Sequence, residues 1–191
     1  MINHNPEIEV VVANATDLAK KYNHEYVTLE HLAHGIVSFK PFNDLLIAFG
    51  CDTVGLLADI DDYLSKQTFM TSSHEDHIPK KTHSLERIFN RAFTQVLFSG
   101  RNHVQIIDIF LSLVSETNSY ASYFFLKYGL DRAQVVDFYN EKKRCAEALI
   151  KEGKKQNTSF ATLTQVAFFA SRLAEYRRIV DSEEGKKAKF L

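Results

Sequence analysis

Two glutamates flank a predicted helix start near the beginning of the chain, at Glu25 and Glu30. Between them, Thr28 is a favoured first cap of a helix, because its hydroxyl can accept a hydrogen bond from an unpaired amide of the first turn. Glu30 falls in that first turn, where a negative charge meets the positive end of the helix. We therefore expect both carboxylates close together on a loop-to-helix corner, where they can face a partner. The alternative is that they only cap the helix.

The histidines and cysteines indicate no catalytic or metal site. His24 and His31 are seven residues apart, and we expect structural or solvent-facing roles for them, with adventitious metal binding as the alternative. The run 74–77 (His-Glu-Asp-His) lies in a polar stretch and is interpreted as a solvated loop. Cys51 and Cys145 do not make a disulfide framework, which favours a reduced, cytoplasmic protein. We predict no catalytic residue, no cofactor and no metal.

The composition is that of a globular protein with a real core. The chain has 191 residues, of which 45% are hydrophobic and 25% charged. A formal net charge of −1 gives no global field for nucleic acid or an acidic membrane surface. We find neither a signal-peptide pattern nor an apolar run of the ~18 residues that a membrane span needs. The phosphate-loop pattern Gly-x-x-x-x-Gly-Lys-Ser/Thr is also absent from the sequence, so we do not expect these residues to hydrolyse ATP by that mechanism.

Four helices are predicted over residues 1–65. Apolar residues recur at helical spacing over 7–22 and again from Thr28 to Phe39, where Pro41 ends the pattern. A short helix over 42–48 is closed by Gly50, and a fourth helix covers 53–65. Residues 66–82 are polar and are predicted to form an exposed linker.

The same pattern then repeats over residues 83–140. Ala15 and Ala92 are 77 residues apart, as are Val27 and Val104. The glycines that close the third helices, Gly50 and Gly129, are 79 apart, which indicates a two-residue insertion in the second copy. We predict an all-α fold of two tandem four-helix repeats related by a pseudo-twofold axis. The two repeats would form one domain, because each alone would bury only a marginal core.

The two copies differ at the predicted corner. Where the first copy has Thr28, Glu30 and His31, the second has Gln105, Ile107 and Asp108. The acidic corner therefore belongs to the first copy only, which favours a role beyond capping.

Residues 141–191 lie beyond the repeat. The segment Glu141 to Lys155 is highly charged and is predicted to extend a helix that ends before Gly153. A further helix is predicted from Thr162 to Val180, with an apolar stripe that must pack on the main domain or on another copy of the chain.

Three stretches resemble a known family: residues 24–32 (His-Glu-Tyr-Val-Thr-Leu-Glu-His-Leu), 84–92 and 99–102. They are similar to the N-terminal domain of Clp/Hsp100 ATPases, which has two four-helix repeats. The resemblance covers about residues 2–140. It is closer to the ClpA type than to the ClpB or ClpC type, because residues 102–104 (Asn-His-Val) lack the Gly-Thr-Glu-His that ClpC-like domains carry in both repeats.

The resemblance implies a mobile docking module. In the ClpA type this domain binds a small adaptor of the ClpS type, which delivers substrates with destabilising N-terminal residues, and it also touches some substrates directly. The adaptor surface of the family corresponds here to Glu25, Glu30, Thr82, Arg87, Arg91 and Arg132.

Helix geometry is compatible with that assignment for the two arginines. Arg87 and Arg91 are four residues apart on the predicted helix 85–97, opposite its apolar residues, and so should face solvent. Guanidinium groups near the two carboxylates would form a mixed-charge patch able to orient a protein partner. The alternative is a solvated helix face with a surface ion pair.

Two functional hypotheses remain open. The first is the docking domain of a ClpA-type unfoldase, which binds an adaptor or substrates for the Clp protease. The second is a free-standing Clp-N-like protein that acts as decoy, accessory factor or regulator, since residues 159–165 only faintly resemble the family's connection to its first ATPase module. An enzyme would need a deep polar pocket between the repeats.

Overall fold

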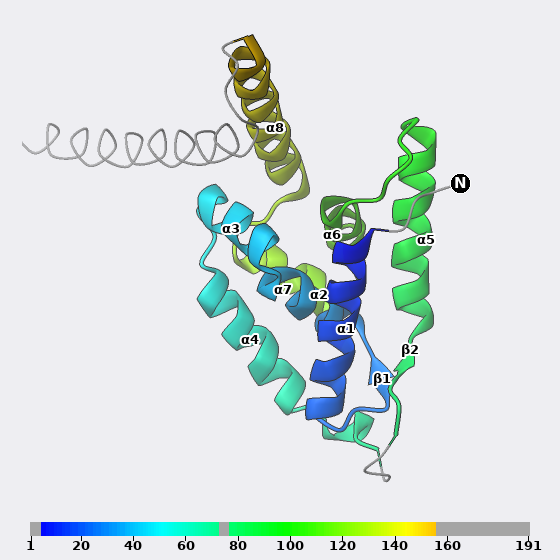
Figure 1. The fold of residues 1–191 in the computed structure, drawn as a ribbon. Helices are drawn as coiled ribbons and strands as arrows, with labels where there is room; N and C mark the ends of the chain where they lie inside the picture. The colour runs from blue at the N-terminus through cyan, green and yellow to red at the C-terminus, as the bar shows by residue number, and fades with distance from the viewer. Residues whose placement is uncertain (1–4, 73–76, 156–191) are drawn as a thin grey trace, which may run out of the picture. The chain divides into compact units, whose positions relative to one another are not determined.

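The structure, a computed structural model, describes residues 5–72 and 77–155. By its internal contacts the chain divides into two units, Met1–Arg132 and Ala133–Leu191, which are taken separately below. Helices dominate the described residues, as predicted, and only two strands of two residues each accompany them (Figure 1).

The first repeat forms its four helices close to the predicted positions. They are α1 (Pro6–Lys21), α2 (Leu29–Ser38), α3 (Lys40–Phe49) and α4 (Thr53–Ser65), with the strand β1 (Tyr26–Val27) between α1 and α2. Pro41 lies in the first turn of α3, where its missing amide costs nothing. Gly50 follows α3 with φ of 97°, in the left-handed region that a glycine adopts without strain.

The second repeat follows the same order. The segment 66–82 before it contains the 3₁₀ turn η1 (Thr68–Met70) and the strand β2 (Lys80–Lys81), and the repeat itself begins with the helices α5 (His83–Phe98), α6 (Ile106–Val114) and α7 (Tyr120–Lys127). The helix that would complete the repeat over 131–138 is instead the start of α8 (Arg132–Lys155), a single helix of 24 residues. The predicted end before Gly153 is therefore wrong, because the charged segment continues the helix without a break.

The core of the first unit is built around α2 and α6. Both are buried on nearly all sides, unlike the one-sided helices α1 and α5. Phe110 of α6 is an aromatic centre, with its ring centroid 5.2 Å from that of Phe42 in α3 and 4.9 Å from that of Phe125 in α7. Since Phe42 belongs to the first repeat and Phe125 to the second, the two repeats share one core.

The segment 66–82 was predicted to be an exposed linker; Lys80 and Lys81 of its strand are exposed, but the described ends also make backbone contacts with the first repeat. Strand β2 pairs in parallel with β1, so that Tyr26 lies opposite Lys80. Before it, Met70 accepts a hydrogen bond from the amide of Glu25, and Ser72 is 8% exposed. The polar composition concealed these bonds because they are made by the backbone. Residues 74–76 of the His-Glu-Asp-His run lie outside the described residues.

Other predicted features fall outside the described residues or have a limited test. The predicted helix from Thr162 to Val180 is outside them. Among the described residues, Cys51 is buried and Cys145 exposed, and neither forms a disulfide. Over the same part of the chain, no single helix is long and apolar enough to cross a membrane, and the pair α3–α4 meets that test only jointly, with a bend of 119°.

Candidate docking site

The start of α5 is positioned by the short sheet. Strand β2 runs directly into α5, and β1 lies beside it at the base of that helix (Figure 1). Thr82 caps α5, since its Oγ1 accepts a hydrogen bond from the amide of Leu85 at 3.3 Å and donates one to the carbonyl of Val27 at 3.3 Å. Glu25 precedes β1, is exposed, and accepts a hydrogen bond from the amide of Lys80 through its carbonyl. The sheet therefore brings Glu25 and Thr82, 57 residues apart in sequence, to one end of α5.

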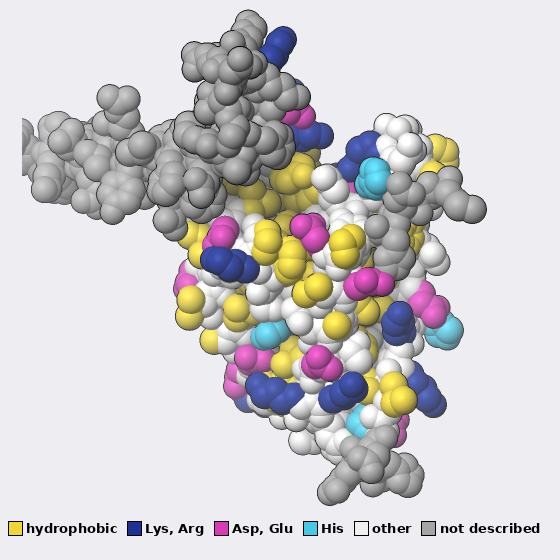
Figure 2. Space-filling model, viewed as in Figure 1, with side chains coloured by type: hydrophobic (Ala, Val, Ile, Leu, Met, Phe, Trp, Pro, Cys, Tyr) yellow, Lys and Arg dark blue, Asp and Glu magenta, His cyan; other side chains and the backbone are white. Residues whose placement is uncertain are grey.

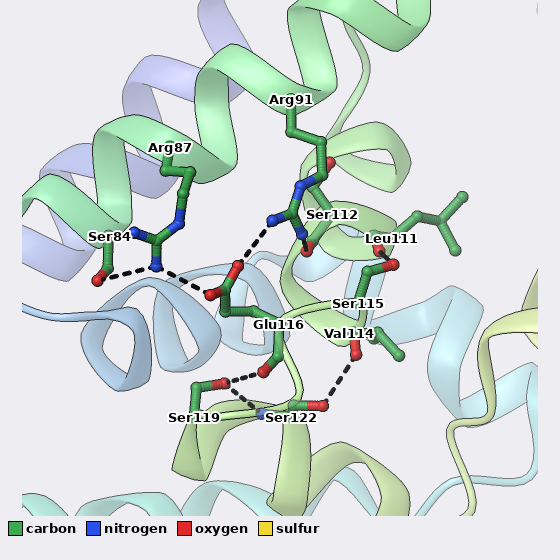
Figure 3. Close-up of polar contacts among 10 residues, drawn as sticks. All are labelled: Ser84, Arg87, Arg91, Leu111, Ser112, Val114, Ser115, Glu116, Ser119 and Ser122. Atoms are coloured by element: carbon green, nitrogen blue, oxygen red, sulfur yellow. Dashed lines mark hydrogen bonds and ion pairs between the residues drawn. The ribbon is translucent and has the colours of Figure 1, made fainter.

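The two arginines of α5 share one carboxylate, that of Glu116. Oε1 of Glu116 lies 2.9 Å from Nη2 of Arg87, and its Oε2 lies 2.8 Å from Nη2 of Arg91 (Figure 3). Arg87 also donates to Ser84 Oγ at 3.3 Å, and Arg91 to the carbonyl of Ser112 at 3.2 Å. We name Arg87, Arg91 and Glu116 the arginine clamp.

The members of the arginine clamp differ in exposure. The side chain of Arg87 is 54% exposed, that of Arg91 32% and that of Glu116 16%. Burial raises the pKa of Glu116, but the hydrogen bonds and charges of Arg87 and Arg91 together outweigh it, so that this pKa lies below its usual value. Glu116 is thus ionised at neutral pH, and the arginine clamp carries one net positive charge.

Glu116 was not among the predicted site residues, although a signal for it exists in the sequence. It lies in residues 115–119, which connect α6 to α7, whereas the equivalent helices α2 and α3 are separated by Phe39 alone. The two-residue insertion inferred from the spacing of the glycines falls in this part of the second repeat. The same connection ends in Ser119, whose hydroxyl donates to the carbonyl of Glu116 and accepts from the amide of Ser122 at the start of α7 (Figure 3).

Glu30 does not lie where the sequence suggested. It is 8% exposed, and its Oε1 accepts a hydrogen bond from the amide of Ala121 at 3.3 Å, in the first turn of α7. The expectation that it shares an exposed corner with Glu25 is therefore wrong. A carboxylate in the first turn of α2 is also within reach of α7, because α2 packs across the repeat boundary, and spacing within one repeat cannot reveal this.

The predicted patch is accordingly rearranged. Leu85, Ile88, Ala92 and Val96 of α5 are buried, as expected, and Arg87 faces solvent. In the part of the chain that the structure describes, however, the ion pairs of both arginines are with Glu116, not with Glu25 or Glu30. Arg132 is exposed at the start of α8, and none of the hydrogen bonds or ion pairs described above, among the described residues, involves it.

The remaining polar groups include a buried pair of histidines. His24 and His31 bond to each other in the interior, with 3.1 Å between Nδ1 and Nε2. Among the described residues there is no group of three or more histidine, cysteine or acidic side chains that could hold a metal ion. On the face drawn in Figure 2, acidic and basic side chains are interspersed with apolar ones, in keeping with a formal net charge of −1.

Comparison with known proteins identifies the family. The model of the Clp repeat (R) N-terminal domain matches residues 3–128. A ClpA homolog protein from Fuscovulum blasticum is 26% identical over 132 residues, which are 69% of this chain and 17% of that relative. The chain thus spans a small part of the relative's length.

Solved structures share the fold at low identity. A chain described under structural investigations of a malarial protein secretion system has a TM-score of 0.62 at 13% identity, covering 74% of this chain and 95% of that one. The Hsp104 N-terminal domain from Candida albicans has a TM-score of 0.57 at 15% identity, covering 69% and 85%. The N-terminal domain of the caseinolytic protease associated chaperone ClpD from Arabidopsis thaliana has a TM-score of 0.51 at 11% identity, covering 73% and 94%.

The family model and two of these solved structures, those of Hsp104 and ClpD, are N-terminal domains, which agrees with the predicted resemblance to the N-terminal domain of Clp/Hsp100 proteins. They also agree with two helical repeats in one domain. The chain therefore belongs to the Clp repeat N-terminal domain family.

Proposed function

We propose that this domain is a protein–protein docking module of a ClpA-type unfoldase system, which binds a ClpS-type adaptor or substrate polypeptides destined for the Clp protease. The observation that carries the proposal is the arginine clamp on α5, within a domain of the Clp N-terminal family. The resemblance to the ClpA type, which rests on residues 102–104, favours the adaptor as the partner.

The chemistry of the arginine clamp suits a protein partner. One net positive charge, centred on a half-exposed guanidinium, attracts a carboxylate without the broad positive field that would collect nucleic acid. Guanidinium groups also bind carboxylates through two parallel hydrogen bonds, which fixes the orientation of the partner. Glu25 and Thr82 extend the surface past the start of α5, so that a partner could meet groups of both signs.

Glu30 has a different place in this proposal from that of the exposed residues. Its carboxylate accepts a hydrogen bond from α7, which makes Glu30 a support for that helix. Only 8% of Glu30 is exposed, so a partner could touch little of it directly. Arg132 stays a candidate contact on the strength of the family resemblance alone.

The test is binding of a purified ClpS-type adaptor from the same organism, measured by calorimetry. We expect wild type to bind and Arg87→Glu combined with Glu25→Arg to lose at least about tenfold in affinity, because both exposed charges are reversed. Lys40→Glu is the control, since it reverses an exposed charge on α3 that, within the described part of the chain, pairs with Asp44. Absence of binding by wild type, or equal losses in the reversed pair and the control, would refute the adaptor role.

A further inference from the structure

We infer that Glu116 is the positioning residue of the proposed docking surface. Its carboxylate holds Arg87 toward solvent, where Arg87 can bind a carboxylate of the partner, and Arg91 in turn holds the carboxylate of Glu116 in place. The inference rests on the proposed function and adds to it a residue from the α6–α7 connection. It also divides the arginines into one that contacts the partner and one that supports.

The first argument is the use of hydrogen-bond donors. Nη2 of Arg87 donates to both Glu116 and Ser84, which uses both hydrogens of that nitrogen. A guanidinium has five N–H groups, and within the described residues the structure gives Nε and Nη1 of Arg87 no protein acceptor. Three donors thus stay available on the more exposed arginine. Arg91 is less exposed and uses Nη1 on the carbonyl of Ser112 and Nη2 on Glu116.

The second argument is that Glu116 is itself fixed. Its amide donates to the carbonyl of Leu113 at the end of α6, and its carbonyl accepts from the hydroxyl of Ser119, the cap of α7. The backbone of Glu116 is therefore held between two helices of the second repeat, and its carboxylate extends from this fixed point to α5. A long, flexible arginine held by such an anchor loses less conformational freedom on binding than one that is free in solvent.

A competing role for Glu116 would have the opposite effect on affinity. If the carboxylate only neutralised the arginines, its removal would raise the net charge of the arginine clamp from one to two and tighten binding of an acidic partner. If it positions Arg87, its removal frees the guanidinium, and binding weakens through faster dissociation. The sign of the change therefore separates positioning from neutralisation.

The experiment compares Glu116→Gln with Glu86→Gln by stopped-flow binding of a ClpS-type adaptor. Glu86→Gln is the matched control, because this substitution removes the same charge from an exposed site on α5. The carboxylate of Glu86 pairs with His83 rather than with an arginine. We expect Glu116→Gln to dissociate about tenfold faster and Glu86→Gln to stay within about twofold of wild type. Equal or tighter binding by Glu116→Gln would overturn the inference.

A third variant and a partner-free measurement keep the result decisive. Glu116→Asp keeps the charge but shortens the reach, so it should fall between wild type and Glu116→Gln if position matters, and equal wild type if charge alone does. The nitrogen-15 spectra of arginine side chains should show slowed guanidinium rotation for Arg87 and Arg91 in wild type and in Glu86→Gln, lost in Glu116→Gln. If wild type bound no adaptor, the proposed function would be refuted, but the spectra would still test whether Glu116 positions Arg87. Unchanged guanidinium rotation in Glu116→Gln would refute the positioning role.

Discussion

His24 and His31 meet with 3.1 Å between Nδ1 and Nε2, at the two positions where the second repeat places Arg101 and Asp108. In that repeat the contact is an ion pair, with 2.6 Å between Arg101 Nη2 and Asp108 Oδ1. Both contacts tie the loop before a central helix to the first turn of that helix. The two repeats thus have a side-chain contact at the same pair of positions, a hydrogen bond between histidines in the first and an arginine–aspartate ion pair in the second.

The hydrogen bonds around His31 fix its protonation. Its Nδ1 accepts from the amide of Thr28 at 3.1 Å, so the ring hydrogen lies on Nε2, which donates to Nδ1 of His24. Adding a proton to either accepting nitrogen would place two N–H groups against each other. Since both rings are almost fully buried, no water can replace the lost bond.

The first prediction is that the domain loses stability in mild acid. Burial lowers the pKa of His31 to about 3, with the neighbouring His24 and His34 adding to the effect, and burial also lowers the pKa of His24. An unfolded histidine takes up a proton near pH 6.5, so the unfolded state binds more protons below that pH, and stability falls as pH decreases from about 6.5 towards about 3.

Urea unfolding at pH 7, 6 and 5 measures this effect. Each buried histidine that stays neutral should contribute a loss of up to about 1.4 kcal/mol per pH unit below about 6.5. The other titratable or charged groups near this cluster, among the described residues, include Tyr22, His34 and Asp61, with Lys21 near His34, and His77, whose Nε2 lies 2.7 Å from the carbonyl oxygen of His24. A free energy of unfolding that stays constant from pH 7 to pH 5 would contradict the prediction.

The second prediction is that the chemistry of the second repeat can be transferred to the first. In the second repeat Asp108 accepts from the amide of Gln105 at 2.9 Å while it pairs with Arg101. His24→Arg with His31→Asp should reproduce both bonds, because the introduced carboxylate would accept from the amide of Thr28. The free energy of unfolding should then vary less between pH 7 and pH 5 than in wild type.

A control is available for this exchange. His83 is fully exposed on α5, and its replacement in His83→Gln removes one histidine without touching the buried pair. It should leave the pH dependence of unfolding as in wild type. If the exchanged variant kept the steep dependence of wild type, the buried histidines would not be its cause.

The helices were predictable because each is encoded locally. Apolar spacing, Pro41 and the closing glycines lie within single elements, and the duplication allowed each half to check the other. The pairing of β1 with β2 was not predicted, because it consists of backbone hydrogen bonds between segments far apart in sequence, with Tyr26 opposite Lys80, 54 residues later. The side chains of these residues do not indicate such a pairing.

The candidate site was predictable in part for the same reason. The outward direction of Arg87 follows from the helical period, which a single sequence shows. The carboxylate that both arginines bind lies on another helix connection, 29 residues after Arg87, and only the insertion hinted at it. The burial of Glu30 depends on how the second repeat docks, which no pattern within the first can specify.

The third prediction concerns Glu30 as a support for α7. Its carboxylate accepts from the amide of Ala121, one of the first-turn amides that have no partner within the helix. Glu30→Ala should lower the free energy of unfolding by about 1–2 kcal/mol, and Glu30→Gln by less, because the amide oxygen can still accept. Urea unfolding at pH 7 measures both changes.

The matched control for this prediction is Glu86→Ala on the exposed face of α5. Its side chain is 59% exposed, and its loss should change the stability by no more than about 0.5 kcal/mol. Should Glu30→Ala prove as mild as Glu86→Ala, Glu30 would be free of a structural role, and its burial would have to serve something else.

The fourth prediction uses Gly35 in α2 and Ser112 in α6, which occupy equivalent positions 77 residues apart. A Cβ at Gly35 would lie 2.7 Å from the carbonyl oxygen of Val11, a backbone atom that cannot move without shifting α1. Gly35→Ala should therefore destabilise by about 1–3 kcal/mol despite the better helix propensity of alanine.

The equivalent substitution in the second repeat should have the opposite effect. The hydroxyl of Ser112 is buried, and none of the described residues provides a hydrogen-bond partner for it. Ser112→Ala removes an unsatisfied polar group and keeps the Cβ, so the free energy of unfolding should stay equal or rise by up to about 1 kcal/mol. Urea unfolding of the two alanine variants side by side measures both effects, and equal destabilisation of the two would contradict the prediction.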